Sequence, residues 1–388
     1  MKKETVLTFT GDIGFDGYMK DRWKDNDLVS SKVRSFLADS THVIANIEGP
    51  LYDGSLKARD NSVAALMHSI DPDACDFLSG ISDIWNICNN HIMDAGPEGI
   101  ESTIDIASAC GALTLGAGMN IEEASSPVII DGDVSVGMIG VGYQRACRKA
   151  DDDAAGCFSW SDLDRIRERI KLIKKECRYC IVVAHAGEEF TALPSPYTRE
   201  RYLSYLDMGA DIVVAHHPHV VNNYELIGDK AIFYSIGNFI FDTNYQRSQM
   251  YTEYGVLLKL RLGQDSFSFE PMGIKVDRTS ERICECGLPD IFADVPAEEY
   301  EKLKGLAAAV FIENTKRQLR YMRPDEFKNA TEDDFCRNFY EPLRSGRVPG
   351  ETLDMQIIYP LSLTAKDLAW KKSGLKKVLS YMLSQTDI

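Results

Sequence analysis

The sequence feature that most constrains the fold is an apolar run that ends in three histidines. Residues 211–219 read Asp-Ile-Val-Val-Ala-His-His-Pro-His, and this run contains 3 of the 7 histidines among 388 residues. A short, continuous apolar run predicts a strand buried on both faces, as in the parallel sheets of α/β proteins. Pro218 has no backbone donor, which predicts a loop leaving this strand.

Three histidines at a strand end indicate a metal site. Neutral imidazole is a common ligand of zinc, manganese and iron. His217 and His219, with one residue between them, could bind one ion or two adjacent ions. The alternative is a polar turn whose histidines, His216 included, face water.

Other predicted strands also end in side chains that bind metals. In chain order these are Asp12 after 6–10, Glu48 after 43–47, Asn90 and His91 after 84–88, and His185 after 180–184. Taken singly, each could be a turn residue, a helix cap or a solvated loop residue. Because the carboxyl ends of strands in an open α/β sheet share one crevice, we expect these side chains to lie together.

Length and hydrophobic content allow one large or two modest domains. Of the 388 residues, 44% are hydrophobic, and β-rich runs alternate with helical stretches such as 161–177, which predicts an α/β fold. After about residue 280 the pattern becomes helical, over 296–314 and 363–384. We therefore predict a catalytic-type domain at 1–280 and a mostly helical extension at 281–388, which could contact a partner.

Charge restricts the classes of partner. A net charge of −16 repels nucleic acids, anionic membranes and long polyanions, so a small substrate or a polymer end is favoured. The chain as given shows no apolar signal region and no run long enough to span a bilayer, which predicts a cytoplasmic protein. The 10 cysteines, among them Cys75, Cys88, Cys110 and Cys180, are expected to be buried free thiols.

Six ordered motifs resemble the CapA-like family of poly-γ-glutamate capsule biosynthesis proteins, a branch of the calcineurin-like metallophosphatase superfamily. The resemblance covers residues 4–275. The motifs are Gly11-Asp12, Asn46-Ile-Glu48, Asn89-Asn90-His91 with Asp94 and Gly96, His185-Ala-Gly-Glu188, His217-Pro-His219-Val220, and the segment from Tyr234 through Asn238 to Asp242.

The resemblance implies a four-layer α/β/β/α sandwich with one or two divalent ions of manganese, iron or zinc. Glu48 would bridge two ions. The remaining metal candidates are Asp12 and His219 on one ion, and Asn90, His185 and His217 on the other. The catalytic candidates are His91, as an acid or substrate clamp, with Glu188 and Asp94 as partners that orient imidazoles. Asn46 and Asn238 are the candidate substrate contacts.

One position departs from the resembled pattern. The wider superfamily has a histidine two residues after the first aspartate, where this chain has Gly14. The first ion would then bind weakly, recruit an oxygen ligand such as Asn46, or be absent. The leading hypothesis is a metal-dependent hydrolase or transferase acting on a phosphoester or a glutamyl amide in capsule biosynthesis. The alternative is a binding or assembly protein with little or no catalysis.

Overall fold

Two β-sheets form the centre of the protein. The computed structural model describes residues 4–54, 66–143, 147–335, 337–338 and 372–386. The first sheet has the order β16-β15-β14-β1-β2-β3-β4, with β13 pairing with β1, and the second has the order β11-β12-β10-β9-β7-β6. Both sheets mix parallel and antiparallel pairs.

The strands of the first sheet are β1 (Thr5–Ile13), β2 (His42–Ile47), β3 (Ile84–Asn86), β4 (Leu113–Leu115), β13 (Asn238–Ile240), β14 (Tyr254–Leu262), β15 (Phe267–Asp277) and β16 (Arg282–Glu285). Those of the second are β6 (Val128–Ile130), β7 (Val136–Gly142), β9 (Tyr179–His185), β10 (Ile212–His216), β11 (Tyr224–Ile227) and β12 (Lys230–Phe233). A separate short pair joins β5 (Ala117–Gly118) to β8 (Gly156–Cys157).

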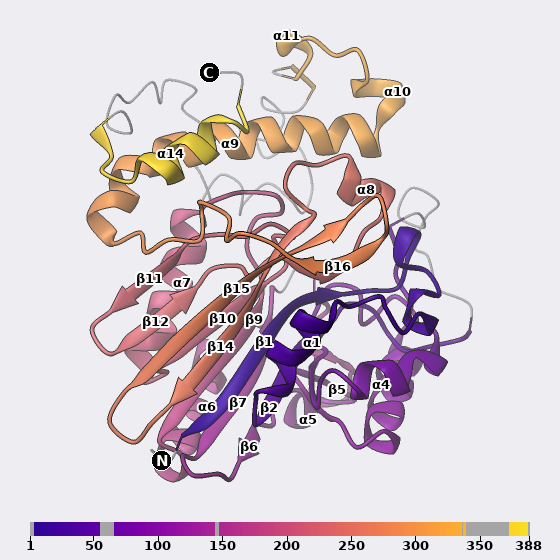
Figure 1. The fold of residues 1–388 in the computed structure, drawn as a ribbon, viewed down its shortest axis with the longest axis vertical. Coiled ribbons are helices and arrows are strands. Elements are labelled where there is room, and N and C mark those ends of the chain that lie inside the picture. Colours follow the sequence, from indigo (N-terminus) through magenta and orange to yellow (C-terminus); the bar gives the residue numbers. More distant parts are fainter. Residues whose placement is uncertain (1–3, 55–65, 144–146, 336, 339–371, 387–388) are drawn as a thin grey trace.

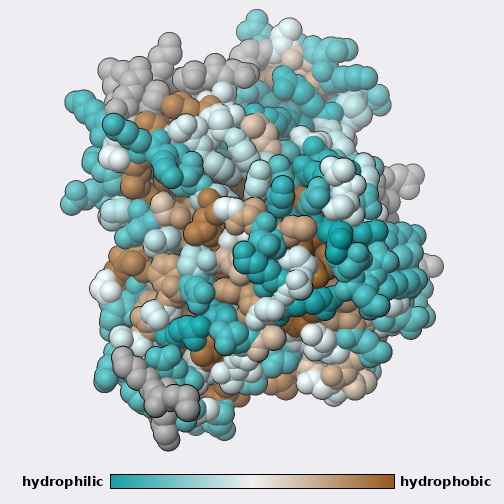
Figure 2. All heavy atoms as spheres, viewed as in Figure 1, coloured by the Kyte–Doolittle hydropathy of each residue, from teal (hydrophilic) through white to brown (hydrophobic). Residues whose placement is uncertain are grey.

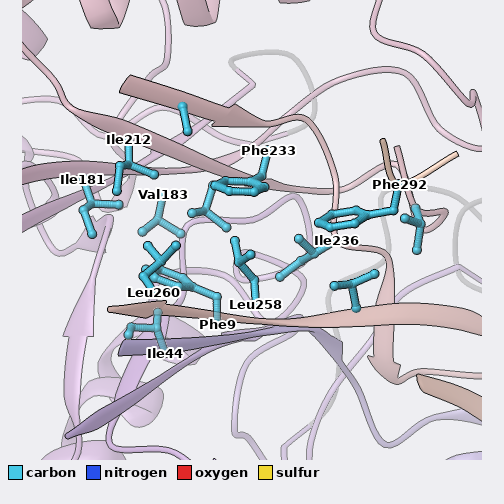
Figure 3. Packing of buried hydrophobic residues seen from close by; sticks show 14 of the residues in the cluster. Phe9, Ile44, Ile181, Val183, Ile212, Phe233, Ile236, Leu258, Leu260 and Phe292 are labelled. Atoms are coloured by element: carbon cyan, nitrogen blue, oxygen red, sulfur yellow. The ribbon is translucent and has the colours of Figure 1, made fainter. Parts of the chain in front are cut away.

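Alternation along the strands explains why the sheets stack. In β9, Ile181 and Val183 face the other sheet, while Val182 and Ala184 face helices, because successive strand side chains point to opposite faces. Figure 3 shows Ile181 and Val183 opposite Phe9 and Leu260 of the first sheet. The apolar core between the sheets is therefore formed by alternate residues of both.

Helices cover the outer faces of both sheets. The first sheet packs against α1 (Ser31–Ala38), α3 (Cys75–Ser79) and α4 (Pro97–Ala109), and the second against α6 (Leu163–Glu176) and α7 (Pro196–Met208). The helix predicted at 161–177 is thus observed at 163–176, where the Asp162 side chain accepts a hydrogen bond from the Arg165 amide. These layers confirm the predicted four-layer sandwich.

C-terminal helices lie across one end of the two sheets (Figure 1). They are α9 (Ala297–Met322), α10 (Pro324–Phe327), α11 (Glu332–Phe335) and α14 (Lys376–Leu383), and short helices α5 (Ile121–Ala124) and α8 (Asn244–Arg247) occur earlier. The helix predicted at 296–314 continues to Met322, and the part of the predicted 363–384 helix before residue 372 lies outside the described residues. A C-terminal helical extension is thus confirmed.

The extension shares the central core. Leu303, Leu306 and Val310 of α9 and Met382 of α14 belong to the same buried cluster as the strands between the sheets. On the face in Figure 2, hydrophilic residues predominate, with hydrophobic ones mainly over the strands on its left side. The domain boundary at residue 280 stays a prediction.

The expectation of free thiols is wrong for one pair. Cys75 at the start of α3 and Cys110 at the end of α4 form a disulfide, with their Cα atoms 6.6 Å apart. The two cysteines lie 35 residues apart in the chain, so only the packing of α3 beside α4 brings them together. None of the described helices combines the length and apolar content needed to cross a membrane.

The docking of α9 predicts a stability effect. Leu303 is fully buried, so Leu303→Ala should lower the free energy of unfolding by about 2–5 kcal/mol through lost burial and a cavity. Denaturant unfolding measures this, with Leu288→Ala as the control because Leu288 is 43% exposed. Equal midpoints for the two variants would show that α9 does not pack on the core in solution.

Candidate metal centre

Strand register places the predicted residues in two rows. In the first sheet Asp12 pairs with Asn46, and Asn46 with Asn86, across β1, β2 and β3. In the second sheet His185 pairs with His216 across β9 and β10. Each row lies at the carboxyl end of parallel strands, where the sequence predicted the site.

A cross-sheet contact brings the two rows together. His216 Nε2 lies 2.9 Å from the backbone oxygen of Thr10, which joins β10 to β1. Gly11 allows this region to pack closely, because a Cβ there would lie 2.1 Å from the Gly237 carbonyl oxygen. His216 therefore links the two sheets, and His217 and His219, which follow it in the chain, lie in the site.

The loop after β10 has a strained backbone. His217 and His219 have φ values of +95° and +57°, a region that residues other than glycine rarely adopt. Such strain persists where surrounding contacts fix the conformation, and it is concentrated at functional sites. Here the strained residues are His217 and His219, whose imidazoles lie at the ends of the two sheets.

Glu48 lies at the centre of the converging side chains. Its Oε1 is 3.7 Å from His185 Nε2 and 3.4 Å from His219 Nε2. His185 Nε2 lies 2.7 Å from Asn90 Oδ1, and ligand atoms of Asp12, Glu48 and His185 all lie within 4.8 Å of one another. His217 packs beside His185, with ring centroids 4.9 Å apart. The structure thus brings all six predicted metal ligands together.

Several buried polar atoms of this cluster have no hydrogen bond within the described part of the chain. Among the described residues, neither oxygen of Glu48, nor Asp12 Oδ2, nor Nδ1 of His185 or His217 has a hydrogen bond, although all are buried. Buried carboxylates and imidazoles without partners cost free energy unless a proton or cation satisfies them. Carboxylate oxygen and imidazole nitrogen together suit manganese, iron or zinc, so these residues fit a divalent ion.

Burial and mutual charge shift the pKa values of the centre. Burial raises the pKa of Glu48 well above its usual range, although the nearby His219 opposes this. Burial acts against protonation of His219, but the charges of Glu48 and Asp12 raise its pKa to about 10. Burial lowers the pKa of His217 to about 4. In the metal-free protein, Glu48, His217 and His219 therefore share a small number of protons, because burial disfavours the charged form of each.

Two predicted site residues lie behind the ligands. Asn46 donates to Asp12 Oδ1 at 2.8 Å and accepts from Asn86. Asn238 Oδ1 lies 3.0 Å from His219 Nδ1, while its amide nitrogen donates to Thr252 and Gln246. Both asparagines thus make positioning contacts with residues of the cluster, and their contact with a substrate stays a prediction.

Glu188 does not orient an imidazole. Its carboxylate accepts hydrogen bonds from the amide and hydroxyl of Ser195 and from the hydroxyl of Thr198, at 2.7–2.8 Å. Ser195 is the N-cap of α7, so Glu188 fixes the start of that helix. Asp94 does make the predicted contact, with its Oδ2 2.7 Å from His91 Nδ1. His91 lies in the turn after β3, since that strand ends at Asn86.

Phe241 occupies the space beside Gly14. A Cβ at position 14 would lie 2.6 Å from the Phe241 ring, so no histidine fits there without rearrangement. The same ring stacks on His219, with centroids 5.0 Å apart. The absent imidazole is therefore replaced by an aromatic support for His219.

A cavity of about 610 Å³ opens beside the cluster. It reaches Asn90, His91 and His219 of the centre and also residues that the sequence did not identify: Asp16, His68, Glu189, Tyr245, Gln318, Tyr321 and Met322. His68 directly follows the apolar run 63–67, so the pattern of strand ends could have identified it, whereas Gln318, Tyr321 and Met322 follow no such run. The last three belong to α9, which thereby forms one wall of the cavity.

Fold and site together define a two-sheet α/β sandwich with carboxylate and imidazole side chains gathered at its strand ends. Residues 6–243 match the family model described as "Bacterial capsule synthesis protein PGA_cap". The match covers more than half of the chain, and the chain belongs to that family.

Two curated relatives are similar to this chain over 249 and 256 residues. The PGA biosynthesis protein CapA of Bacillus subtilis is 27% identical over 62% of this chain and 64% of its own length. The capsule biosynthesis protein CapA of Bacillus anthracis is 26% identical over 64% of this chain and 62% of its own. The chain thus spans less than two thirds of the length of these relatives.

Among solved structures, one described as a novel phosphatase of Mycoplasma pneumoniae resembles this chain. Its TM-score is 0.45 at 12% identity, and the superposition covers 71% of this chain and 95% of that one. A likeness this distant carries no argument about activity.

The low pKa of His217 predicts an acid-labile metal-free protein. Unfolding returns this pKa from about 4 to 6.5, so acidification from pH 6.5 toward 4 removes stability that is present above pH 6.5. His219 acts in the opposite direction, since its stabilisation is complete below pH 6.5 and is lost as pH rises toward 10. After chelation, the melting temperature of His217→Asn should therefore fall less between pH 7 and 5 than that of the wild type.

Thermal unfolding at both pH values measures this difference. The wild-type protein at pH 7 with and without chelator gives the contribution of bound metal separately. Parallel pH dependences in variant and wild type would mean that His217 is not buried in the metal-free state.

Proposed function

We propose that this protein is a metal-dependent hydrolase of capsule biosynthesis that acts on a phosphoester, with a glutamyl amide as the second substrate class. The observation that carries the proposal is Glu48, a buried carboxylate without a hydrogen-bond partner among the described residues, between His185 and His219 and beside a cavity. Such a site suits metal-assisted attack by water on an ester or amide. The names of the relatives support a role in capsule or polyglutamate production.

The ligand set divides into two groups that share Glu48. Asp12 and His219 would hold one ion, and Asn90, His185 and His217 the other. When bound, divalent ions would acidify a water molecule and stabilise the charge that develops on the substrate. Asn238 keeps Nδ1 of His219 engaged, which leaves Nε2 directed at Glu48. Asn46 likewise fixes the carboxylate of Asp12.

His91 is proposed to donate a proton to the leaving group or to stabilise its charge. Its Nδ1 is held by Asp94, so Nε2 is the nitrogen left for the cavity that both residues line. Burial, together with the charge of His68, lowers the pKa of His91 to about 4, so the ring would become a proton donor only when an anionic substrate beside it favours the protonated form. A group of this kind typically contributes about 10²- to 10⁴-fold to the rate.

A second candidate function is that of a binding or assembly protein. Phe241 fills the space beside Gly14, so the first ion would have one imidazole fewer than in the resembled superfamily. The buried face of α9 is used in packing on the core, so a partner would contact the other face of the C-terminal helices. Under this proposal metal binding persists while turnover is absent.

Metal counting tests the proposal directly. Protein purified without chelator and loaded with manganese or zinc should hold about two ions per chain, and Glu48→Gln should lose both because it removes the shared charge. Asp12→Ala should lose one. Elemental analysis measures the metal, and hydrolysis of bis(p-nitrophenyl) phosphate and of a γ-glutamyl anilide measures turnover. His42→Ala is the control, since His42 lies at the other end of β2.

The outcomes separate the two candidate functions. Loss of metal and turnover together in Glu48→Gln supports the hydrolase. Metal in the wild type without turnover of either probe supports the assembly protein. An unchanged metal content in Glu48→Gln would overturn the assignment of the centre itself.

Replacement of His91 gives a separate prediction. His91→Gln should retain bound metal, since His91 is not a proposed ligand, and should lower kcat by about 10²- to 10⁴-fold. Steady-state kinetics with the phosphodiester probe, together with elemental analysis, measure the two effects. A loss of metal equal to that of Glu48→Gln would instead make His91 part of the ligand set.

A further inference from the structure

Two histidine–carboxylate pairs lie side by side in the wall of the cavity. His91 Nδ1 is 2.7 Å from Asp94 Oδ2, and His68 Nδ1 is 2.9 Å from Asp16 Oδ2. The two imidazole rings are in contact edge to face, with centroids 4.2 Å apart. All four residues line the cavity of about 610 Å³. Of these, the His68 pair has no role in the function proposed so far.

The two pairs are joined into one unit. The backbone amide of His68 donates to Asp94 Oδ2 at 2.8 Å, so the carboxylate that orients the His91 ring also fixes the position of His68. In each pair the carboxylate engages Nδ1, and Nε2 is left as the ring nitrogen that can meet a ligand. The arrangement therefore presents two neighbouring Nε2 atoms from rings held in fixed orientations.

Histidines are the only basic side chains among the described residues that line the cavity. Among the described residues that line it there is no lysine or arginine, while Asp16, Asp94 and Glu189 contribute carboxylates. Within that described lining, an anionic substrate oxygen outside the metal ligands finds ring nitrogens only on histidine. A ring nitrogen whose partner nitrogen is held by a carboxylate can exchange a hydrogen bond with a phosphate oxygen, either as the donor or as the acceptor from a protonated phosphate.

Phe241 connects the His68 pair to the metal centre. The Phe241 ring stacks on His219 and also contacts His68, with a centroid distance of 5.1 Å. It fills the space beside Gly14, where an imidazole is absent. The Phe241 ring thus occupies the space that a histidine at position 14 would need, and it also packs against His68.

We propose that His68 is a second substrate-contacting imidazole, which together with His91 binds a nonbridging oxygen of a tetrahedral oxyanion such as a phosphate ester. Asp16 is then a positioning residue, because it acts through the His68 ring. This inference rests on the proposed function in one respect, that the substrate is an oxyanion bound beside the metal ligands. It adds a substrate-contacting residue outside the six motifs.

The experiment measures oxyanion affinity as well as turnover. The full chain is loaded with zinc, freed of unbound metal, and titrated with inorganic phosphate by calorimetry, for wild type, His68→Gln and Asp16→Asn. Loss of one charge-assisted hydrogen bond should weaken phosphate binding about tenfold or more in His68→Gln. Asp16→Asn, which keeps the imidazole but weakens its orientation, should show a smaller loss. Metal content should equal that of wild type in both.

A matched control is available on another part of the surface. His42 forms the same kind of pair with Asp83, at 2.6 Å, and lines a different cavity of about 390 Å³. His42→Gln removes an equivalent imidazole and should leave phosphate affinity and metal content unchanged. With the phosphodiester probe, His68→Gln should raise KM as well as lower kcat, whereas a merely structural effect would lower the amount of folded protein.

The outcomes for His68 and for the hydrolase are distinguishable. Wild-type phosphate affinity in His68→Gln at equal metal content overturns the role of His68, whatever the turnover. An absence of phosphate binding in the wild type overturns it too. If His68→Gln fails to fold or loses metal, Asp16→Asn decides: reduced affinity with full metal supports the proposal, and unchanged affinity overturns it. Affinity that depends on His68 without any turnover overturns the hydrolase alone.

Discussion

The site depends on the burial of the Glu48 carboxylate. Both of its oxygens are inaccessible to solvent and lack hydrogen-bond donors among the described residues, a state that costs several kcal/mol for an unpaired ion. The nearest compensating groups are His185 and His219, at 3.7 and 3.4 Å, beyond hydrogen-bond distance. A divalent cation bound there would keep this group charged at neutral pH, so under the proposed function metal binding would also stabilise the fold.

The strand ends could be predicted because their chemistry is local. An apolar run followed by His185 or His217 predicts a strand and places the histidine at its carboxyl end. In a parallel arrangement the carboxyl ends of the strands lie at the same edge of the sheet. The same argument found Asp12 and Glu48. It could not assign roles among buried amides, because Asn46 and Asn238 differ from substrate-facing asparagines only in what surrounds them. Glu188 was misread for that reason: its partners belong to the start of α7.

Other features of the site arise from contacts distant in sequence. The wall formed by α9 depends on Tyr321 packing against Tyr245, with ring centroids 5.1 Å apart, and on Asn314 donating to the backbone oxygen of Phe190. Phe190 in turn packs near His219. Residues after 243 lie outside the matched family segment, so part of the cavity wall is supplied by a region in which relatives can differ. The disulfide of Cys75 with Cys110 was missed for the same reason of sequence distance.

The relation between Gly14, Phe241 and His68 shows how a site can change one motif position and still place imidazoles beside its cavity. Judged by the motif alone, Gly14 removes an imidazole and weakens the case for catalysis. In three dimensions the vacated space is filled by Phe241, which stacks on one proposed ligand, His219, and contacts His68. His68 is oriented by Asp16 and lies against His91, so an imidazole remains in the same cavity although it comes from a different segment. What a site requires is a ring nitrogen in a given place with a given orientation, and a fold can meet that requirement from any segment that reaches the cavity.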